Sequence, residues 1–198
     1  DLAPEHYLAL EGGIRANAGR WSAEASYHHT DIEDMIVRHL DGRTAPTGEA
    51  IVLKKNSGHG EIRGVEVTAT YHWTEEWSLW GNYTWMEGTL ETPTGPTGPL
   101  TIEPVSRLMP TTFDVGLRYE RKDRKFWAEF ASTIAARQDR LSSADRRDTQ
   151  RIPPNGTPGY ELFHLRAGWK PTDRFTLSAA LENLTDADYR IHGSGINE

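Results

Sequence analysis

Several features are missing from this chain of 198 residues, and each absence narrows the class of protein. It has no cysteine, which excludes disulfide bonds and thiolate metal sites. It has no run of roughly 20 apolar residues, the length that a membrane-spanning helix needs, and its mean hydropathy is −0.66. A helical membrane protein is thereby excluded. A membrane β-barrel is compatible with such values, because its strands alternate apolar and polar side chains.

An excess of positive charge is also missing. The net charge is −7, whereas nucleic-acid-binding proteins usually present a basic patch, so no nucleic-acid partner is expected. Residues 1–4 show neither the basic region nor the apolar run of a signal peptide. Because a barrel must be exported, we expect the start of the chain to be a truncated or processed end.

Alternation of apolar and polar residues runs through most of the chain and predicts β-strands. In 77–85, for example, the odd-numbered residues are apolar or aromatic and most even-numbered ones are polar. No segment shows a convincing helical period. Eight strands are predicted, at 6–16, 20–40, 50–74, 77–90, 111–121, 125–137, 159–170 and 174–184.

The connections alternate between short and long. Tight polar turns lie at 17–19, 75–76, 122–124 and 171–173, and long loops at 41–49, 91–109 and 138–158. This is the pattern of an outer-membrane barrel, whose short turns face the periplasm. Because 20–40 and 50–74 are longer than a bilayer requires, we expect them to extend above it as a hairpin with its tip at 41–49.

Aromatic residues gather beside the short turns, mostly on the apolar face of each strand. Such rings favour the membrane–water interface. From Trp77 to Trp85 the strand covers roughly 26 Å at ~3.3 Å per residue, or roughly 20 Å along the membrane normal for a tilt of ~40°, close to the ~25 Å apolar band of such barrels. Trp80 and Trp127 fall on the other face and are expected to point into the lumen. The predicted girdle consists of Trp21, Trp73, Trp77, Trp85, Tyr119, Phe126, Trp169 and Phe175.

Three stretches resemble the C-terminal barrel of TonB-dependent receptors. They are Asn-Ser-Gly at 56–58 followed by Ile-Arg-Gly-Val-Glu-Val at 62–67, the run from 104 to 119, and Glu-Asn-Leu-Thr-Asp-Ala-Asp-Tyr-Arg at 182–190. They occur in the order that the family shows. The residues that carry the motifs are Gly64, Glu66, Glu182, Asn183, Leu184, Asp186, Tyr189 and Arg190.

The resemblance implies an all-β fold, an antiparallel transmembrane β-barrel of 22 strands in the outer membrane of a Gram-negative bacterium. Residues 1–198 would supply eight of its last nine strands, with the plug domain and the final strand outside this chain. It further implies a receptor that imports a scarce nutrient, with an iron–siderophore or similar chelate as the expected cargo. The implied partners are TonB, acting through the plug region, outer-membrane lipid and lipopolysaccharide, and the small-molecule nutrient. No cofactor and no enzymatic activity are implied.

The arginine-rich loop at 138–158 is one candidate for substrate contact, because guanidinium groups bind anionic chelates through bidentate, charge-assisted bonds. Three aspartates, at 139, 145 and 148, partly cancel its charge, so a solvated loop or one that binds lipopolysaccharide phosphate stays open. The candidates are Arg137, Arg140, Arg146, Arg147, Arg151 and Tyr160.

A second candidate is the segment 28–34, which holds two histidines and three carboxylates, ligands that suit several divalent ions. Because successive side chains on a strand point to opposite faces, His28 and His29 are not expected to bind one ion together. They stay candidates for substrate contact, with no metal site expected.

Three alternatives stay open. A small self-contained barrel could close with eight strands, but no strand after 184 returns the chain to the periplasm. A soluble β-rich ligand-binding module would need more Ile, Val and Leu. An enzyme is disfavoured because no nucleophile elbow, zinc spacing or phosphate loop is found.

Overall fold

The computed structural model describes residues 2–56, 58–93 and 99–195. Almost all of its regular structure is β. The elements are β1 (His6–Ala18), β2 (Trp21–Glu33), β3 (Ile36–Thr44), β4 (Ala50–Asn56), β5 (Gly60–His72), β6 (Trp77–Pro93), β7 (Leu100–Pro104), β8 (Thr112–Glu120), β9 (Phe126–Ala135), α1 (Ser143–Arg147), β10 (Tyr160–Thr172) and β11 (Phe175–Leu181). None of the described residues belongs to a helix long and apolar enough to cross a membrane.

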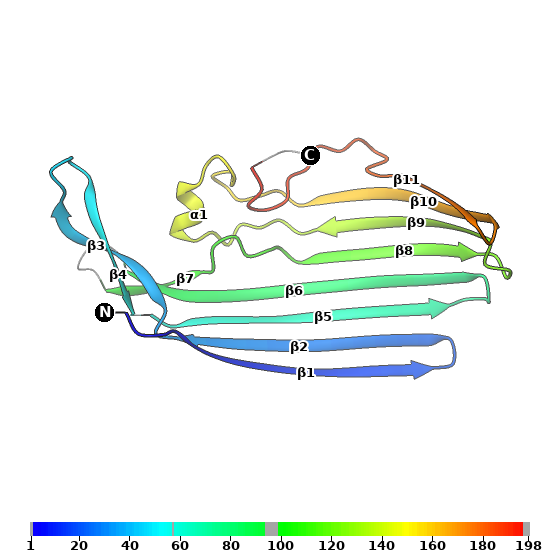
Figure 1. Ribbon diagram of the computed structural model, residues 1–198, viewed down its shortest axis with the longest axis horizontal. Helices are drawn as coiled ribbons and strands as arrows, with labels where there is room; N and C mark the ends of the chain where they lie inside the picture. Colours follow the sequence, from blue (N-terminus) through cyan, green and yellow to red (C-terminus); the bar gives the residue numbers. More distant parts are fainter. Residues whose placement is uncertain (1, 57, 94–98, 196–198) are drawn as a thin grey trace.

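Eight strands form one antiparallel wall in the order β1-β2-β5-β6-β8-β9-β10-β11. Strand β7 pairs with the C-terminal part of β6. The predicted number of eight wall strands is confirmed. Within the described ranges β1 and β11 do not pair with each other, so the wall does not close into a small barrel. The sheet is therefore an open, curved segment with two edge strands (Figure 1).

The two ends of the wall differ in the length of their connections (Figure 1). The four short turns lie at one end, here called the turn end. Positive φ angles at Gly19 (59°) and Arg124 (55°) allow the chain to reverse there. The hairpin β3–β4, strand β7, helix α1 and the long loops lie at the other end, here called the loop end.

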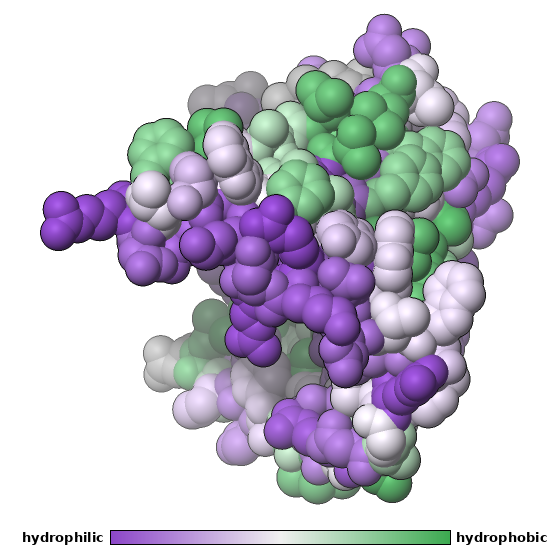
Figure 2. Space-filling model, turned by 90° about the vertical axis from the view of Figure 1, so that its right-hand side faces the viewer, coloured by the Kyte–Doolittle hydropathy of each residue, from purple (hydrophilic) through white to green (hydrophobic). Residues whose placement is uncertain are grey.

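The pairing register places the two kinds of side chain on opposite faces. Tyr27 lies opposite Val65, and Val65 lies opposite Trp85, so apolar side chains share what we call the outer face. That face is uncovered: Ile14 is 72% exposed and Trp21 is 56% exposed. Viewed along the strands, hydrophilic side chains border a hollow, and less polar ones line the opposite margin (Figure 2). A β-sandwich would bury this apolar face against a second sheet, whereas a lipid bilayer solvates it.

The sequence-based prediction was wrong for the two longest strands. The range 20–40 contains β2 and β3, which are separated at Asp34 (φ 56°), and 50–74 contains β4 and β5, separated near Gly58 (φ 153°). Asp tolerates the left-handed conformation at such a break. Asn56 stabilises it by donating from Nδ2 to the Asp34 carbonyl over 2.9 Å. The hairpin β3–β4 thereby leaves the wall as a separate two-stranded sheet.

The predicted long loops are also more ordered than the sequence indicated. Strand β7 lies within 91–109, where it pairs with the end of β6. Helix α1, which is only five residues long, lies within 138–158. Both are too short to produce a periodic sequence pattern.

Candidate functional site

The loop between β9 and β10 folds as a compact unit at the loop end of the wall. Ser142 caps α1, and its hydroxyl accepts a hydrogen bond from the Asp145 backbone while the Asp145 carboxylate accepts one from the Ser142 N–H. Asp145 is only 1% exposed, and so is Ile152. This loop is therefore held by its own small core.

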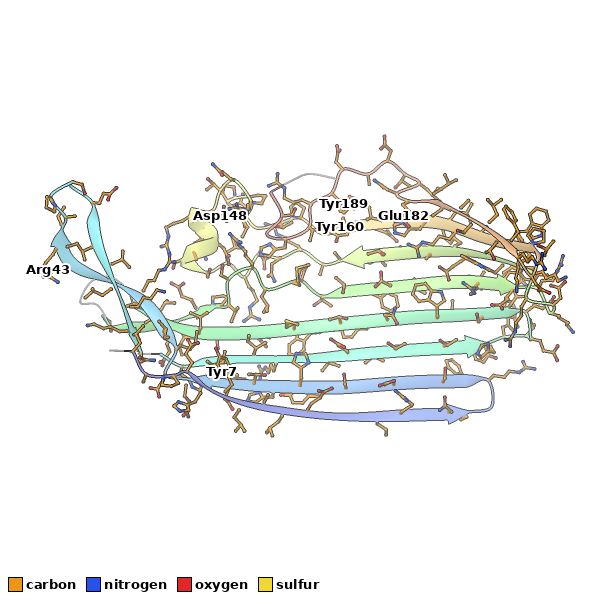
Figure 3. The ribbon with its side chains drawn as sticks, in the orientation of Figure 1. Tyr7, Arg43, Asp148, Tyr160, Glu182 and Tyr189 are labelled. Carbon is orange, nitrogen blue, oxygen red and sulfur yellow. The ribbon has the colours of Figure 1, made fainter. Side chains whose placement is uncertain are left out.

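Asp145 also joins this loop to the connection between β7 and β8. Its Oδ1 accepts hydrogen bonds from the Ser106 hydroxyl (2.6 Å) and the Arg107 N–H (3.1 Å). Burial raises the pKa of the carboxyl, but the hydrogen bonds from Ser106, Ser142 and Arg107 outweigh it, and the net pKa lies below the usual range. Asp148, labelled in Figure 3, adds an ion pair of 2.7 Å to Arg107.

A cavity of about 870 Å³ opens between this loop, β6–β7 and the hairpin β3–β4. Its size is within the range of small-molecule sites. Most of its walls are apolar, and a few charged and hydroxyl groups interrupt them. It is lined by Val37, Arg38, Val52, Leu90, Thr92, Pro93, Glu103, Pro104, Ser106, Ser142, Ser143, Ala144 and Arg147.

The charges around this cavity are mainly positive. Arg38 and Arg147 line it from opposite elements, and Lys54 lies opposite Arg38 in the register, on the same face of the hairpin. In the described part of the chain, none of these three side chains has a hydrogen bond or ion pair. Among the described lining residues, the acidic one is Glu103, which accepts a hydrogen bond of 2.8 Å from the Ser143 N–H. The cavity therefore offers unpaired cations beside apolar surface.

One polar group in the cavity wall also lacks a partner. The Oγ1 atom of Thr92 is buried and, among the described residues, makes no hydrogen bond. Such groups are uncommon in folded proteins. The cavity thus combines unpaired guanidinium groups with an unsatisfied hydroxyl.

The arginines proposed from sequence separate into two groups. Three have partners elsewhere: Arg137 donates to the Asn155 carbonyl, Arg140 binds Glu87 on the outer face, and Arg151 pairs with Asp148. Arg147 lines the cavity, and Arg146 is exposed on the same helix. The structure therefore brings only part of this group to the cavity.

Tyr160 lies beside Tyr189, with ring centroids 4.8 Å apart (Figure 3). Both line a smaller space of about 300 Å³ with Pro153, Pro158, Gly159, Asp188 and Arg190. Tyr189 belongs to the third motif, and Arg190 donates to the Arg151 carbonyl over 3.4 Å. The motif thereby fixes the C-terminal segment to the loop at 151–160.

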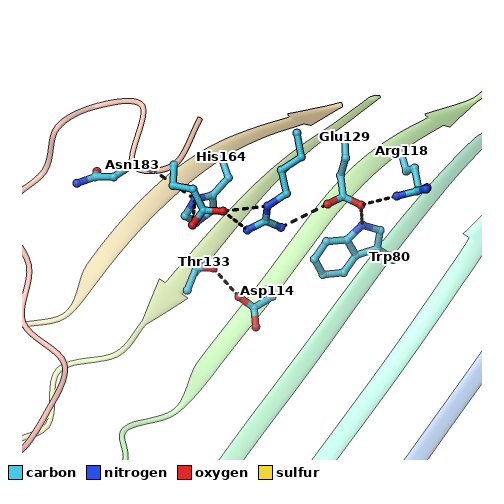
Figure 4. A network of polar contacts seen from close by, with 9 residues as sticks. Trp80, Asp114, Arg118, Glu129, Thr133, His164 and Asn183 are labelled. Atoms are coloured by element: carbon cyan, nitrogen blue, oxygen red, sulfur yellow. Dashed lines mark hydrogen bonds and ion pairs between the residues drawn. The ribbon is translucent and has the colours of Figure 1, made fainter. Parts of the chain in front are cut away.

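The inner face carries a polar network centred on Glu129 (Figure 4). Trp80 donates from its indole nitrogen to Glu129 over 3.1 Å, and Arg118 and Arg166 pair with the same carboxylate at 3.6 and 3.4 Å. Arg166 also binds Glu182 of the third motif at 3.0 Å. Arg118 also contacts Glu120 at 3.5 Å, so two guanidinium groups face three carboxylates and every charged group of the network has a partner of opposite sign. The network suits a polar wall better than a reactive centre.

Glycines make room for the aromatic rings of this face. A Cβ atom at Gly116 would overlap the indole of Trp80, and one at Gly168 would overlap that of Trp127. The guanidinium of Arg118 lies 4.2 Å from the Trp127 ring centre, a cation–π contact. Trp80 and Trp127 thus lie flat against the inner wall.

The two histidines occupy opposite faces of β2. The ring of His28 fills the space beside Gly64 on the inner face, where a Cβ atom would be 2.5 Å from it. His29 lies on the outer face and contacts Asp31 at 3.0 Å. Across the described residues, no three His, Asp or Glu side chains gather in a way that could hold a metal ion.

The other motif residues shape the backbone near the end of β11. Asn183 (φ 50°) exchanges two hydrogen bonds of 3.0 Å with the backbone of Ala187, and Asp186 has φ 51°. The Leu184 N–H donates to the Phe163 carbonyl. Glu66, by its place in β5, points to the inner face.

The aromatic residues beside the turns form contacts across strands on the outer face. The rings of Trp21 and Tyr71 are in contact with centroids 4.3 Å apart, and Trp77, Tyr119 and Phe126 form a row with centroids 5.1 and 6.3 Å apart. Trp73, Trp169 and Phe175 are at least half exposed. Their role as a membrane-interface girdle stays a prediction.

Sequence reasoning missed Arg38, Lys54 and Glu103. The first two lie in the predicted strands 20–40 and 50–74, and the third lies in the predicted long loop 91–109. A hairpin with its tip at 41–49 would have brought Arg38 and Lys54 together, because residues opposite each other in a hairpin share a face. No sequence signal of this kind indicates Glu103.

Comparisons with known proteins agree with this architecture. The family described as TonB dependent receptor-like, beta-barrel matches residues 1–184. The ferric enterobactin receptor PirA of Pseudomonas aeruginosa is 26% identical over 188 residues, which are 94% of this chain and 24% of that protein. The solved structure of the copper transporter OprC has a TM-score of 0.75 at 21% identity, covering 100% of this chain and 28% of that one.

A further solved structure, the FrpB iron transporter from Neisseria meningitidis (F3-3 variant), has a TM-score of 0.72 at 18% identity and covers 96% of this chain and 28% of that one. The chain thus spans about a quarter of the length of the relatives it matches. The structural likenesses concern the fold, whereas the family match covers nearly all of the sequence. The chain belongs to the TonB-dependent receptors, as part of their β-barrel.

Proposed function

We propose that the protein carrying this chain is an outer-membrane active transporter of a Gram-negative bacterium. It would bind a scarce nutrient, an iron–siderophore or similar chelate, at the cell surface and import it with energy delivered by TonB. The family membership supports a role as a transporter and not as an enzyme. The related ferric enterobactin receptor and the FrpB iron transporter support an iron-bearing cargo.

The observation that carries the proposal is the cavity at the loop end. Its size fits a small molecule and its walls are largely apolar. Arg38, Lys54 and Arg147 present positive charge there, with no hydrogen bond or ion pair to any residue that the structure describes. A compact chelate with apolar ring surfaces and a net negative charge complements such a site. Of the substrate-contact residues that the sequence predicts, Arg147 is the one among the described lining residues of this cavity.

The rest of the chain supplies the wall around the transport path. Its outer face would contact lipid, and its inner face would contact the plug domain and water. The network around Glu129 is suited to that inner position, because each of its charged groups has a partner of opposite sign and the indole nitrogen of Trp80 is hydrogen-bonded. TonB would act on the plug domain.

The test is uptake of radiolabelled iron chelates by cells that carry or lack the complete gene. Deletion is expected to abolish uptake of an anionic aryl chelate, and collapse of the proton gradient is expected to do the same in wild-type cells. Uptake that survives gradient collapse would indicate a passive pore. Uptake unchanged by deletion, for every iron chelate and other nutrient tried, would refute the transport proposal.

The cavity is tested by a double variant, Arg38→Gln with Arg147→Gln. Charge-assisted contacts contribute about 1.5–3 kcal/mol each, so the loss of two is expected to weaken binding of the chelate to the purified receptor by at least about 100-fold. Arg121→Gln with Lys122→Gln is the matched control, because it also removes two cations, from the turn between β8 and β9 at the opposite end of the wall. Equal weakening by both variants would point to a general charge effect and not to this cavity.

A further inference from the structure

His192 is a buried histidine at the loop end. It is 5% exposed and lies in the segment after β11, which runs beside the loop that carries α1 (Figure 1). Its Nδ1 atom is 2.8 Å from the hydroxyl of Thr157, which is itself only 2% exposed. It is not among the described lining residues of the cavity or of the smaller space beside Tyr160. Folding has thus removed a titratable group from water without placing it in a binding site.

A series of hydrogen bonds connects this histidine to the wall of the cavity. Thr157 and Gln138 exchange two backbone hydrogen bonds, of 2.9 and 3.0 Å. Gln138 is 8% exposed, and its Nε2 donates to the Leu108 carbonyl over 2.8 Å. The residue before Leu108 donates its backbone N–H to Asp145, the carboxylate that caps α1. Because the cap and the helix line the cavity, the series ends in its wall.

Arginines from three segments approach the surroundings of His192. Arg107, in the connection between β7 and β8, would lie 3.3 Å from a Cβ atom at position 193. Arg151, in the loop after β9, would lie 3.9 Å from one at position 195. Arg190, two residues before His192, donates to the Arg151 carbonyl over 3.4 Å. An imidazolium at His192 would therefore lie near other cations.

The two aspartates near these arginines are engaged elsewhere. Asp145 already accepts three hydrogen bonds, and it affects His192 only through its charge. Asp148 pairs with Arg107 at 2.7 Å and with Arg151 at 3.2 Å. His192 makes no ion pair with any residue that the structure describes. Burial lowers the pKa of His192, and the charge of Asp145 opposes this effect without cancelling it.

We propose that protonation of His192 releases the C-terminal segment and loosens the wall of the cavity that α1 forms. A buried charge without a partner is unfavourable, so the charged ring is expected to leave its place beside Thr157. The loop after β9 then loses the contact that joins it to the C-terminal segment. The cavity would be ordered at neutral pH and looser in acid. This inference concerns the regulation of the cavity, and it rests on the proposed function only where the cavity is taken as the cargo site.

Proton linkage gives the direction and the upper limit of the effect. Because the folded pKa lies below the unfolded value of about 6.5, the stability that His192 contributes is present above that value and is lost as the pH falls through the folded pKa. At pH 5 the unfolded segment binds the proton with a factor of roughly 30, which is the largest possible loss of protection.

The experiment measures hydrogen exchange at pH 7 and pH 5 in the complete receptor, purified in detergent, with rates corrected for intrinsic exchange. In the wild type, peptides covering 138–152 and 186–195 are expected to exchange between about 3-fold and 30-fold faster at pH 5. His192→Gln keeps a hydrogen-bonding side chain that does not titrate, so its corrected rates at the two pH values are expected to be equal. His192→Asn is measured in parallel, so that a folding defect in one variant leaves the comparison intact.

Two further variants test the position and the route of the effect. His72→Gln is the matched control, because it removes an exposed histidine from the turn end of β5, and it should keep the acid response of the wild type. Thr157→Val removes the hydroxyl beside His192 at nearly constant volume. In this variant 186–195 should still respond to acid, whereas the response of 138–152 should decrease.

The absence of an acid response of 138–152 in the wild type would overturn the proposal. A response that persists in His192→Gln and His192→Asn would do the same, because another group would then be the sensor. An undiminished response of 138–152 in Thr157→Val would contradict the route through that hydroxyl. Backbone exchange is read without cargo, so failure of the transport proposal would not affect this result.

Discussion

Replacing Asp145 by asparagine tests whether one carboxylate holds the loops over the cavity. Asp145 is 1% exposed and accepts three hydrogen bonds, from the Ser106 hydroxyl and the backbones of Arg107 and Ser142. Asparagine keeps the volume but replaces the oxygen that faces the Ser142 N–H by an NH₂ group. One charge-assisted bond is lost, at about 1.5–3 kcal/mol, and a buried donor is left unpaired, at about 1–3 kcal/mol.

We therefore expect Asp145→Asn to lower the local stability of this loop by about 3 kcal/mol, which corresponds to roughly 100-fold faster exchange at 1.36 kcal/mol per factor of ten. The measurement is hydrogen exchange of peptides covering 104–108 and 138–152 in the complete receptor. Asp139→Asn is the control, because Asp139 is 65% exposed and pairs with Arg137 only at 3.7 Å. Unchanged exchange in Asp145→Asn would refute the reasoning.

The same carboxylate predicts a pH dependence. Because its folded pKa lies below the usual value, the stability that it contributes is present above the unfolded pKa of about 3.9 and is lost as the pH falls through the folded pKa. Exchange in this loop, corrected for its intrinsic rate, is expected to be constant from about pH 6 to 8. Faster exchange of this loop within that pH range in the wild type, absent from Asp145→Asn, would contradict the lowered pKa of Asp145.

Two other predictions concern the inner wall and the C-terminal segment. Gly168→Ala would force Trp127 away from its place against the wall and is expected to lower the stability of the barrel by about 1–3 kcal/mol, measured by thermal unfolding in detergent. Gly12→Ala is the control that should change little, because a Cβ atom there meets nothing within 4 Å. His192 is 5% exposed and hydrogen-bonded to Thr157 at 2.8 Å, and burial lowers its pKa despite the opposing effect of Asp145. Its stabilising contribution is therefore expected above the unfolded pKa of about 6.5 and lost as the pH falls through the folded value. Exchange of 186–195 should accelerate at pH 5 in the wild type but less in His192→Phe, and equal acceleration in both would contradict the assignment.

The wall could be predicted from sequence because each strand reports its own environment. In a single-layer sheet between lipid and a polar lumen, every strand alternates by itself, with no help from a partner layer. Strand β6 is an example: its aromatic outer residues and polar inner residues are legible within 77–85. The short turns are equally local, and the number of wall strands followed from them.

The loop end could not be predicted in the same way, because its structure depends on contacts distant in sequence. Asp145 contacts Ser106 across 39 positions, and Arg140 contacts Glu87 across 53. The cavity takes its charges from β3, which the sequence predicts only as a continuation of β2, and from α1, which no periodic pattern predicts. An arginine-rich loop indicated an anion site, yet the structure pairs Arg137, Arg140 and Arg151 with other groups and leaves Arg147 to meet Arg38 at the cavity. The composition of the loop thus indicated binding of an anion. Which cations border the cavity depends on the break at Asp34, because that break turns the hairpin β3–β4 out of the wall.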